Sequence, residues 1–127
     1  MILADTSIWV DHLWASDPLM ADRLNSKEIL CHPLVIGELA MGNLANRATL
    51  LHALTRIPQA VRARDSEVMA LVERERLFGI GIGFVDAHLL ASTLLTDGAR
   101  LWTRDRRLHA AAVQLEIALD LALPARH

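Results

Sequence analysis

Short apolar runs alternate along this chain with longer segments of helical periodicity, and this order leaves few folds open. The apolar runs cover residues 2–4, 28–31, 100–103 and 117–121. Strands joined through helices are parallel, and a parallel sheet is stable only when helices cover both of its faces. The sequence therefore predicts an α/β fold, a three-layer α/β/α sandwich around a central parallel sheet of about four to five strands.

Proline and glycine mark several helix boundaries. Pro18 and Pro33 stand where helices begin, and Gly42, Gly79 and Gly98 stand where they end. We expect helices after the first strand and over residues 19–24, 33–42, 47–57, 65–78, 84–96 and from 105 onward. On the helix over residues 33–42, the expected core side carries Leu34, Glu38 and Met41.

The length and composition favour one domain with a partner surface. A chain of 127 residues predicts a single domain over residues 1–127, while its hydrophobic share of 53% exceeds what so small a core absorbs. Charged residues interrupt each apolar stretch, so we expect neither a membrane span nor a signal peptide. The lone cysteine, Cys31, excludes an internal disulfide and fits the reducing cytoplasm. The net charge of −2 does not decide for or against a nucleic-acid partner.

Four acidic residues occupy unusual places. Asp5 ends the first apolar run, and Asp105 follows the run at residues 100–103. Open parallel sheets bind ligands beyond the carboxyl ends of their strands, where both of these acids are expected. Asp86 interrupts an apolar helix start, and Glu38 is expected near the core side of its helix. Each acid has an ordinary alternative, a helix cap for the three aspartates and an arginine partner for Glu38.

Taken together, the four acids favour a metal site. Clustered carboxylates repel one another unless a cation or a proton lies among them. Oxygen ligands around an open site suit Mg²⁺ or Mn²⁺, and such a site can serve phosphodiester hydrolysis. The scattered histidines show no zinc-ligand spacing, and the glycines at 79, 81 and 83 fit neither a dinucleotide loop nor a phosphate-binding loop. A turn that delivers Asp86 is the expected role of these glycines.

The segments that carry the acids resemble those of PIN-domain ribonucleases, and of the VapC-type toxins in particular. They read Ala-Asp-Thr-Ser-Ile-Trp at residues 4–9, Val-Ile-Gly-Glu-Leu at 35–39, Phe-Val-Asp-Ala-His at 84–88 and Leu-Trp-Thr-Arg-Asp at 101–105. They occur in the order of that family and span nearly the whole chain. The resemblance implies a PIN-like sheet with the acids at its carboxyl edge. It also implies Mg²⁺- or Mn²⁺-dependent cleavage of RNA, homodimerisation, and inhibition by an antitoxin protein whose tail enters the site.

The resemblance also suggests a role for each site residue. Asp5, Asp86, Glu38 and Asp105 are the candidate catalytic and metal-binding residues, with Asp105 the most variable position in such proteins. Three hydroxyl residues are candidates for supporting roles, and three arginines are candidates for holding the RNA backbone: Thr6, Ser7 and Thr103, and Arg104, Arg106 and Arg107.

Two other functions fit parts of the sequence. A phosphatase of the haloacid-dehalogenase type also begins with a strand that ends in aspartate, but it needs a second aspartate where Ser7 stands. An inactive PIN-like domain that only binds a partner is the alternative outside enzymology. A pure scaffold would not need all four acids, so we favour a growth-inhibiting endoribonuclease acting on a structured tRNA or rRNA loop.

Overall fold

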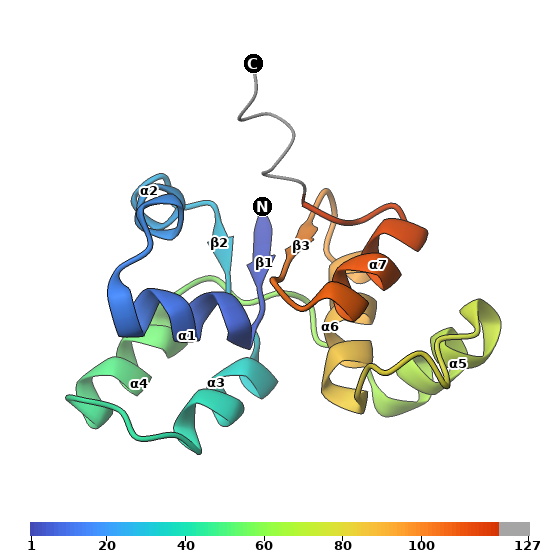
Figure 1. Ribbon diagram of the computed structural model, residues 1–127, viewed down its shortest axis with the longest axis horizontal. Coiled ribbons are helices and arrows are strands. Elements are labelled where there is room, and N and C mark those ends of the chain that lie inside the picture. Colours follow the sequence, from blue (N-terminus) through green and yellow to red (C-terminus); the bar gives the residue numbers. More distant parts are fainter. Residues whose placement is uncertain (120–127) are drawn as a thin grey trace.

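The computed structural model describes residues 1–119, in which helices alternate with three short strands (Figure 1). The elements in chain order are β1 (Ile2–Ala4), α1 (Thr6–Ala15), α2 (Pro18–Asn25), β2 (Ile29–Leu30), α3 (Pro33–Ala40), α4 (Arg47–Arg56), α5 (Asp65–Glu75), α6 (Phe84–Leu95), β3 (Arg100–Trp102) and α7 (Arg106–Gln114). The strands form a parallel sheet in the order β2-β1-β3. In Figure 1, α1 to α4 gather beside β2, and α5 to α7 gather beside β3. The predicted α/β/α class is confirmed.

The sheet is narrower than the four to five strands expected from the sequence. Within residues 1–119, each edge of the three-stranded sheet is extended only by an isolated parallel bridge, Cys31 with Gln59 and Leu101 with Ala118. The expected strand at residues 117–121 is reduced to the second bridge, and residues 120 and 121 lie outside the described part. The number of strands is lower because a few backbone hydrogen bonds already pair this edge of the sheet. Leu101 N–H donates to the Ile117 carbonyl at 2.8 Å, so the β3 edge is paired without a further regular strand.

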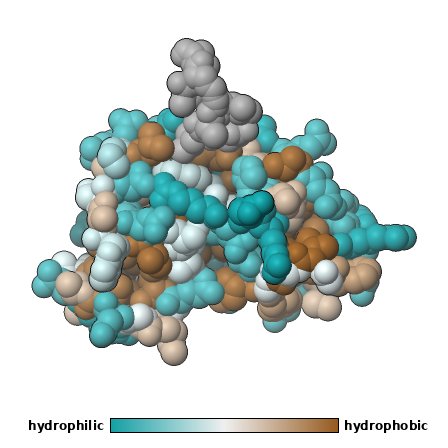
Figure 2. All heavy atoms as spheres, viewed as in Figure 1, coloured by the Kyte–Doolittle hydropathy of each residue, from teal (hydrophilic) through white to brown (hydrophobic). Residues whose placement is uncertain are grey.

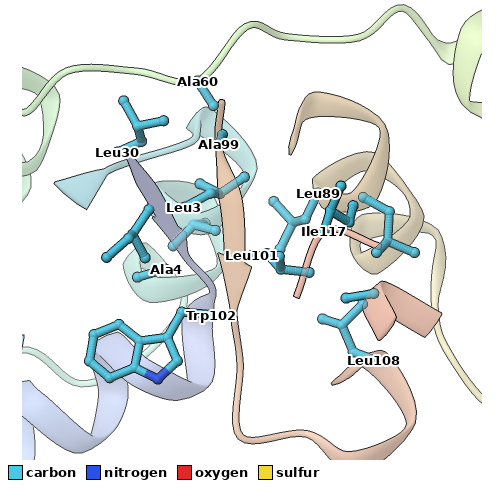
Figure 3. Packing of buried hydrophobic residues seen from close by; sticks show 14 of the residues in the cluster. Leu3, Ala4, Leu30, Ala60, Leu89, Ala99, Leu101, Trp102, Leu108 and Ile117 are labelled. Carbon is cyan, nitrogen blue, oxygen red and sulfur yellow. The ribbon is translucent and has the colours of Figure 1, made fainter. Parts of the chain in front are cut away.

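The core lies between the sheet and its helices. Leu3 and Leu101, from the two neighbouring strands β1 and β3, are fully buried and lie side by side. Leu89 of α6 and Leu108 of α7 pack against Leu101 (Figure 3). Burial on both sides of the sheet explains why β1 is apolar throughout and why β3 is apolar after the exposed Arg100. It also explains why the first polar residue after β1, Asp5, marks the end of that strand.

Two helices differ in detail from the sequence prediction. In α3 the buried side chains are Val35 and Leu39, whereas Glu38 and Met41 are exposed, so the expected core side was wrong. Val35 and Leu39 are separated by one helical turn and define the buried stripe. The helix expected over residues 65–78 ends instead at Glu75, because Arg76 adopts a left-handed conformation with φ of 54°. Among residues 1–119, no helix is long and apolar enough to cross a membrane.

Candidate active site

Asp5 is the anchor of the site. It follows β1 directly and is 5% exposed. Its Oδ1 accepts hydrogen bonds from Ser7 Oγ at 2.5 Å and from Ile8 N–H at 3.2 Å, so it also caps α1. Its Oδ2 accepts a hydrogen bond from Thr103 Oγ1, which follows β3. Because β1 and β3 are parallel neighbours, their carboxyl ends meet, and Figure 3 shows their last residues, Ala4 and Trp102, close together.

Asp105 lies two residues after Thr103 and is hydrogen-bonded to it. Its N–H donates to Thr103 Oγ1 at 3.0 Å, so one hydroxyl links the backbone of Asp105 to the carboxylate of Asp5. Asp105 Oδ1 caps α7 by accepting from the N–H groups of Arg107 at 2.9 Å and Leu108 at 3.0 Å. The capping alternative considered for Asp105 is therefore realised. Within residues 1–119 its Oδ2 receives no hydrogen bond.

Glu38 reaches the site from α3. The sequence placed it near the core side of that helix, whereas its side chain is exposed and Oε1 accepts a hydrogen bond from Thr6 Oγ1 at 2.5 Å. The partner is thus a threonine in the first turn of α1, not an arginine. This contact joins α1 to α3 across 32 residues of sequence and ties Glu38 to Thr6, the residue that follows Asp5.

Asp86 enters from the third side, in the first turn of α6. The turn before it contains Gly79 and Gly81 with φ values of 71° and 86°, a region of backbone space that favours glycine. Asp86 Oδ2 accepts a hydrogen bond from Gly83 N–H at 3.1 Å, which caps the helix. The glycine segment therefore forms the expected turn ahead of Asp86.

The charges of the site act on Asp86. Partial burial raises the pKa of the Asp86 carboxyl most strongly, and the hydrogen bond from Gly83 offsets part of this effect. The negative charges of Asp105, Asp5 and Glu38 each raise the pKa further. The other three predicted acids are therefore near enough to Asp86 to repel its charge. Such repulsion is what a bound cation would relieve.

The donor set fits a hydrated divalent cation better than a bare one. Within residues 1–119, no three acidic, histidine or cysteine side chains are arranged to enclose an ion directly. Mg²⁺ keeps several waters and is commonly held by only one or two carboxylates. Carboxylate oxygens around a site open to solvent match this chemistry, with Asp5 fixed by its hydrogen bonds and the exposed Glu38 able to adjust.

The three arginines of the α7 start differ in their surroundings. Arg104 is engaged by Asp11 and Asp17, whereas Arg106 and Arg107 are exposed and have no ion pair within the described residues. Arg107 lies against Gly81, since a side chain added at that glycine would come within 2.6 Å of Arg107 Nη1. Arg107 therefore crosses the glycine turn that leads to Asp86.

The two acidic partners of Arg104, Asp11 and Asp17, are not among the residues predicted from the sequence. Asp17 stands directly before Pro18 and caps α2 through Leu19 N–H at 2.9 Å, so the helix-start signal marks its position. Nothing in the local sequence distinguishes Asp11 from a solvent-exposed helix residue.

Comparisons with known proteins identify the family of the chain. The PIN domain family model matches residues 2–114, so the chain belongs to the PIN-domain family. More particularly, the chain is 49% identical over 119 residues to Ribonuclease VapC32 of Mycobacterium tuberculosis, in strains CDC 1551 / Oshkosh and ATCC 25618 / H37Rv. That alignment covers 94% of this chain and 96% of each relative. The family predicted from the four acidic segments is confirmed.

A solved structure shares the fold. The crystal structure of PAE2754 from Pyrobaculum aerophilum aligns with a TM-score of 0.62 and 21% identity, over 94% of this chain and 87% of that one. At this identity the similarity concerns the fold alone, and it places the three-stranded core among known architectures.

Proposed function

We propose that this chain is a single-domain, metal-dependent endoribonuclease of the VapC type that cleaves a structured tRNA or rRNA loop and inhibits growth. The convergence of Asp5, Glu38, Asp86 and Asp105 at one edge of the sheet carries the proposal. Its support is that the relatives with 49% identity are named ribonucleases and that the chain covers almost their whole length.

The four acids would hold Mg²⁺ or Mn²⁺, directly or through water. The bound cation would supply the positive charge that phosphodiester hydrolysis requires. Ser7 and Thr103 orient Asp5, and Thr6 orients Glu38, through the hydrogen bonds described above. The exposed Arg106 and Arg107 would contact the RNA backbone beside the acids.

RNA cleavage is the direct test. Purified protein, freed of any partner, is incubated with total bacterial RNA in Mn²⁺, in Mg²⁺ and with a chelator. We expect discrete fragments that appear with the metals and disappear with the chelator, and sequencing of their ends identifies the target. If folded protein binds Mn²⁺ and leaves tRNA and rRNA intact, the endoribonuclease proposal fails and a partner-binding PIN-like domain is favoured.

An antitoxin is the proposed protein partner, and an apolar groove beside Glu38 supports it. The groove has a volume of about 630 Å³ and lies where α1, α3 and α4 meet. Its lining includes Val10, Leu13, Trp14, Leu39 and Leu50. Hydrophobic atoms are visible on this part of the surface in Figure 2. A groove of this kind suits the apolar face of a helix, and Glu38 in its lining would bring the antitoxin tail to the acids.

Trp14 gives a test of this groove. Its side chain is 90% exposed, so Trp14→Ala should leave the free energy of unfolding unchanged. Exposed aromatic side chains that become buried in an interface often contribute about 2 kcal/mol or more to affinity, so we expect the antitoxin to bind about 30-fold more weakly. Titration calorimetry measures this, with Val113→Ala on α7 as the control. Equal affinity for both variants would place the antitoxin elsewhere.

Homodimerisation and a cytoplasmic location complete the proposal. Large apolar side chains are also exposed away from the groove, among them Phe78 and Phe84, which flank the glycine turn. They support a second interface, as the hydrophobic composition suggested. Cys31 is buried and forms no disulfide within the described residues, and burial raises its pKa to about 11, which fits a structural thiol. A structural thiol of this kind is compatible with the proposed cytoplasmic location.

A further inference from the structure

Arg104 lies where the connection between β3 and α7 passes the first two helices. Its guanidinium contacts two carboxylates, Asp11 Oδ2 on α1 at 2.8 Å and Asp17 Oδ2 at the start of α2. Its central carbon lies 5.7 Å from the ring centre of Trp102, the last residue of β3. Arg104 therefore joins the end of β3 to the first two helices, whose contacting residues lie 93 and 87 residues away in sequence.

The two carboxylates accept hydrogen bonds from the guanidinium N–H groups with which Arg104 would bind a phosphate. Asp17 is only 14% exposed as a side chain, and Arg104 is 36% exposed. Partial burial alone would raise the pKa of the Asp17 carboxyl, but the hydrogen bonds from Arg104 and from Met20 and Leu19 outweigh this effect and leave its pKa lowered. The charge of Arg104 is thus already balanced within the protein. An RNA phosphate would have to displace one of these acids.

The backbone of Arg104 is joined to the acids of the site. Arg104 N–H donates to Ser7 Oγ at 3.0 Å, and Ser7 Oγ donates to Asp5 Oδ1 at 2.5 Å. Thr103, the residue before Arg104, donates a hydrogen bond to Asp5. It also accepts one from the N–H of Asp105, the residue after Arg104. A displacement of Arg104 would therefore loosen the hydrogen bonds that fix Asp5 and the start of α7.

We propose that Arg104 is a positioning residue: its ion pairs with Asp11 and Asp17 hold the β3–α7 connection against α1 and α2, and thereby keep Asp5 and Asp105 in place. This role replaces the RNA-backbone contact expected for Arg104 from the sequence. It rests on the proposed nuclease function only for its effect on the reaction, since the contacts themselves are independent of the substrate.

The test removes both ion-pair partners of Arg104 and leaves Arg104 itself unchanged. The double variant Asp11→Asn, Asp17→Ser removes both carboxylates, and serine at position 17 retains a good cap for α2. The control is Arg64→Gln, which breaks an exposed ion pair with Glu67 on α5, away from the acids. Amide hydrogen exchange by NMR is measured in both variants without metal or RNA. Steady-state RNA cleavage in Mn²⁺ is measured in parallel.

We expect exchange of the Arg104 and Asp105 amides to become about tenfold faster in the double variant, because local opening becomes easier. Exchange of the Gly83 amide, which is hydrogen-bonded to Asp86 on another element, should not change. In the control variant, exchange of the Arg104, Asp105 and Gly83 amides should all stay as in the wild type. In the cleavage assay kcat should fall about tenfold with KM within about twofold, which is the pattern of displaced catalytic groups.

An RNA-binding Arg104 predicts the opposite result. Its release from two carboxylates would then lower KM and leave kcat unchanged, and unchanged amide exchange would likewise overturn the proposal. The exchange measurement decides the matter even if no RNA is cleaved. In that case the nuclease function fails, while the positioning role is still judged on the Arg104 and Asp105 amides.

Discussion

Asp86→Asn is expected to abolish RNA cleavage and to make the metal-free protein more stable. The loss of cleavage, about 1000-fold or more, follows from removing a charged ligand from the cation site. Asparagine keeps a side-chain oxygen that can accept from Gly83 N–H, so the cap of α6 is preserved. The variant thus removes the charge and little else.

The gain in stability follows from the direction of the Asp86 pKa shift. A carboxyl whose pKa is raised in the folded protein ionises less readily there than in the unfolded chain, so at neutral pH its charge opposes folding. This cost is absent at pH values below the unfolded pKa and grows as the pH rises toward the raised folded value. Since Asp86 is half-buried and solvent screens it, we expect a gain below about 1 kcal/mol.

Thermal unfolding in a chelator at pH 7 measures this effect, and a gain of that size raises Tm by up to about 4 °C. Asp86→Ala is the matched variant: it removes the charge and the cap together, and losing the cap alone costs about 1 kcal/mol. If Asp86→Asn were less stable than the wild type without metal, the carboxylate would have a favourable partner and the repulsive acid cluster would be refuted.

Much of the site could be predicted because the ends of parallel strands meet. Asp5 follows one apolar run and Asp105 follows another, and adjacent parallel strands bring such residues to one edge whatever the details of packing. The same rule explains why Thr103 was a reasonable candidate to contact the acids. It lies at the end of β3 and donates to Asp5.

Other features depend on how the helices pack, which local sequence does not determine. Glu38 was expected among core residues because its neighbours are apolar, but the rotation of α3 buries Val35 and Leu39 and turns Glu38 toward Thr6. The ion pairs of Arg104 were equally hidden from the local sequence, since Asp11 lies 93 residues away. The number of strands was overestimated because the chain segments at the two edges of the sheet form only single bridges.

Asp5 gives the second large effect, with the opposite sign for stability. Both of its oxygens accept hydrogen bonds, and it is almost completely buried. Asp5→Ala removes the cap of α1 and leaves the hydroxyls of Ser7 and Thr103 without their acceptor. Losing a cap costs about 1 kcal/mol and each unsatisfied buried group costs about 1–3 kcal/mol, so we expect a loss of about 3 kcal/mol together with loss of cleavage.

Urea unfolding of the metal-free protein measures this loss, and a double-mutant cycle with Thr103→Val assigns its cause. If the Thr103 hydroxyl donates to Asp5, removing it should cost about 1–2 kcal/mol less in the Asp5→Ala background than in the wild type. Additive effects would contradict the hydrogen bond. Asp5 and Asp86 thus make distinct contributions: Asp5 is part of the folded corner that organises the site, whereas Asp86 is held there against the cost of its burial and the repulsion of the other acids. An acid that destabilises the metal-free protein but is required for cleavage is what a cation-binding role predicts.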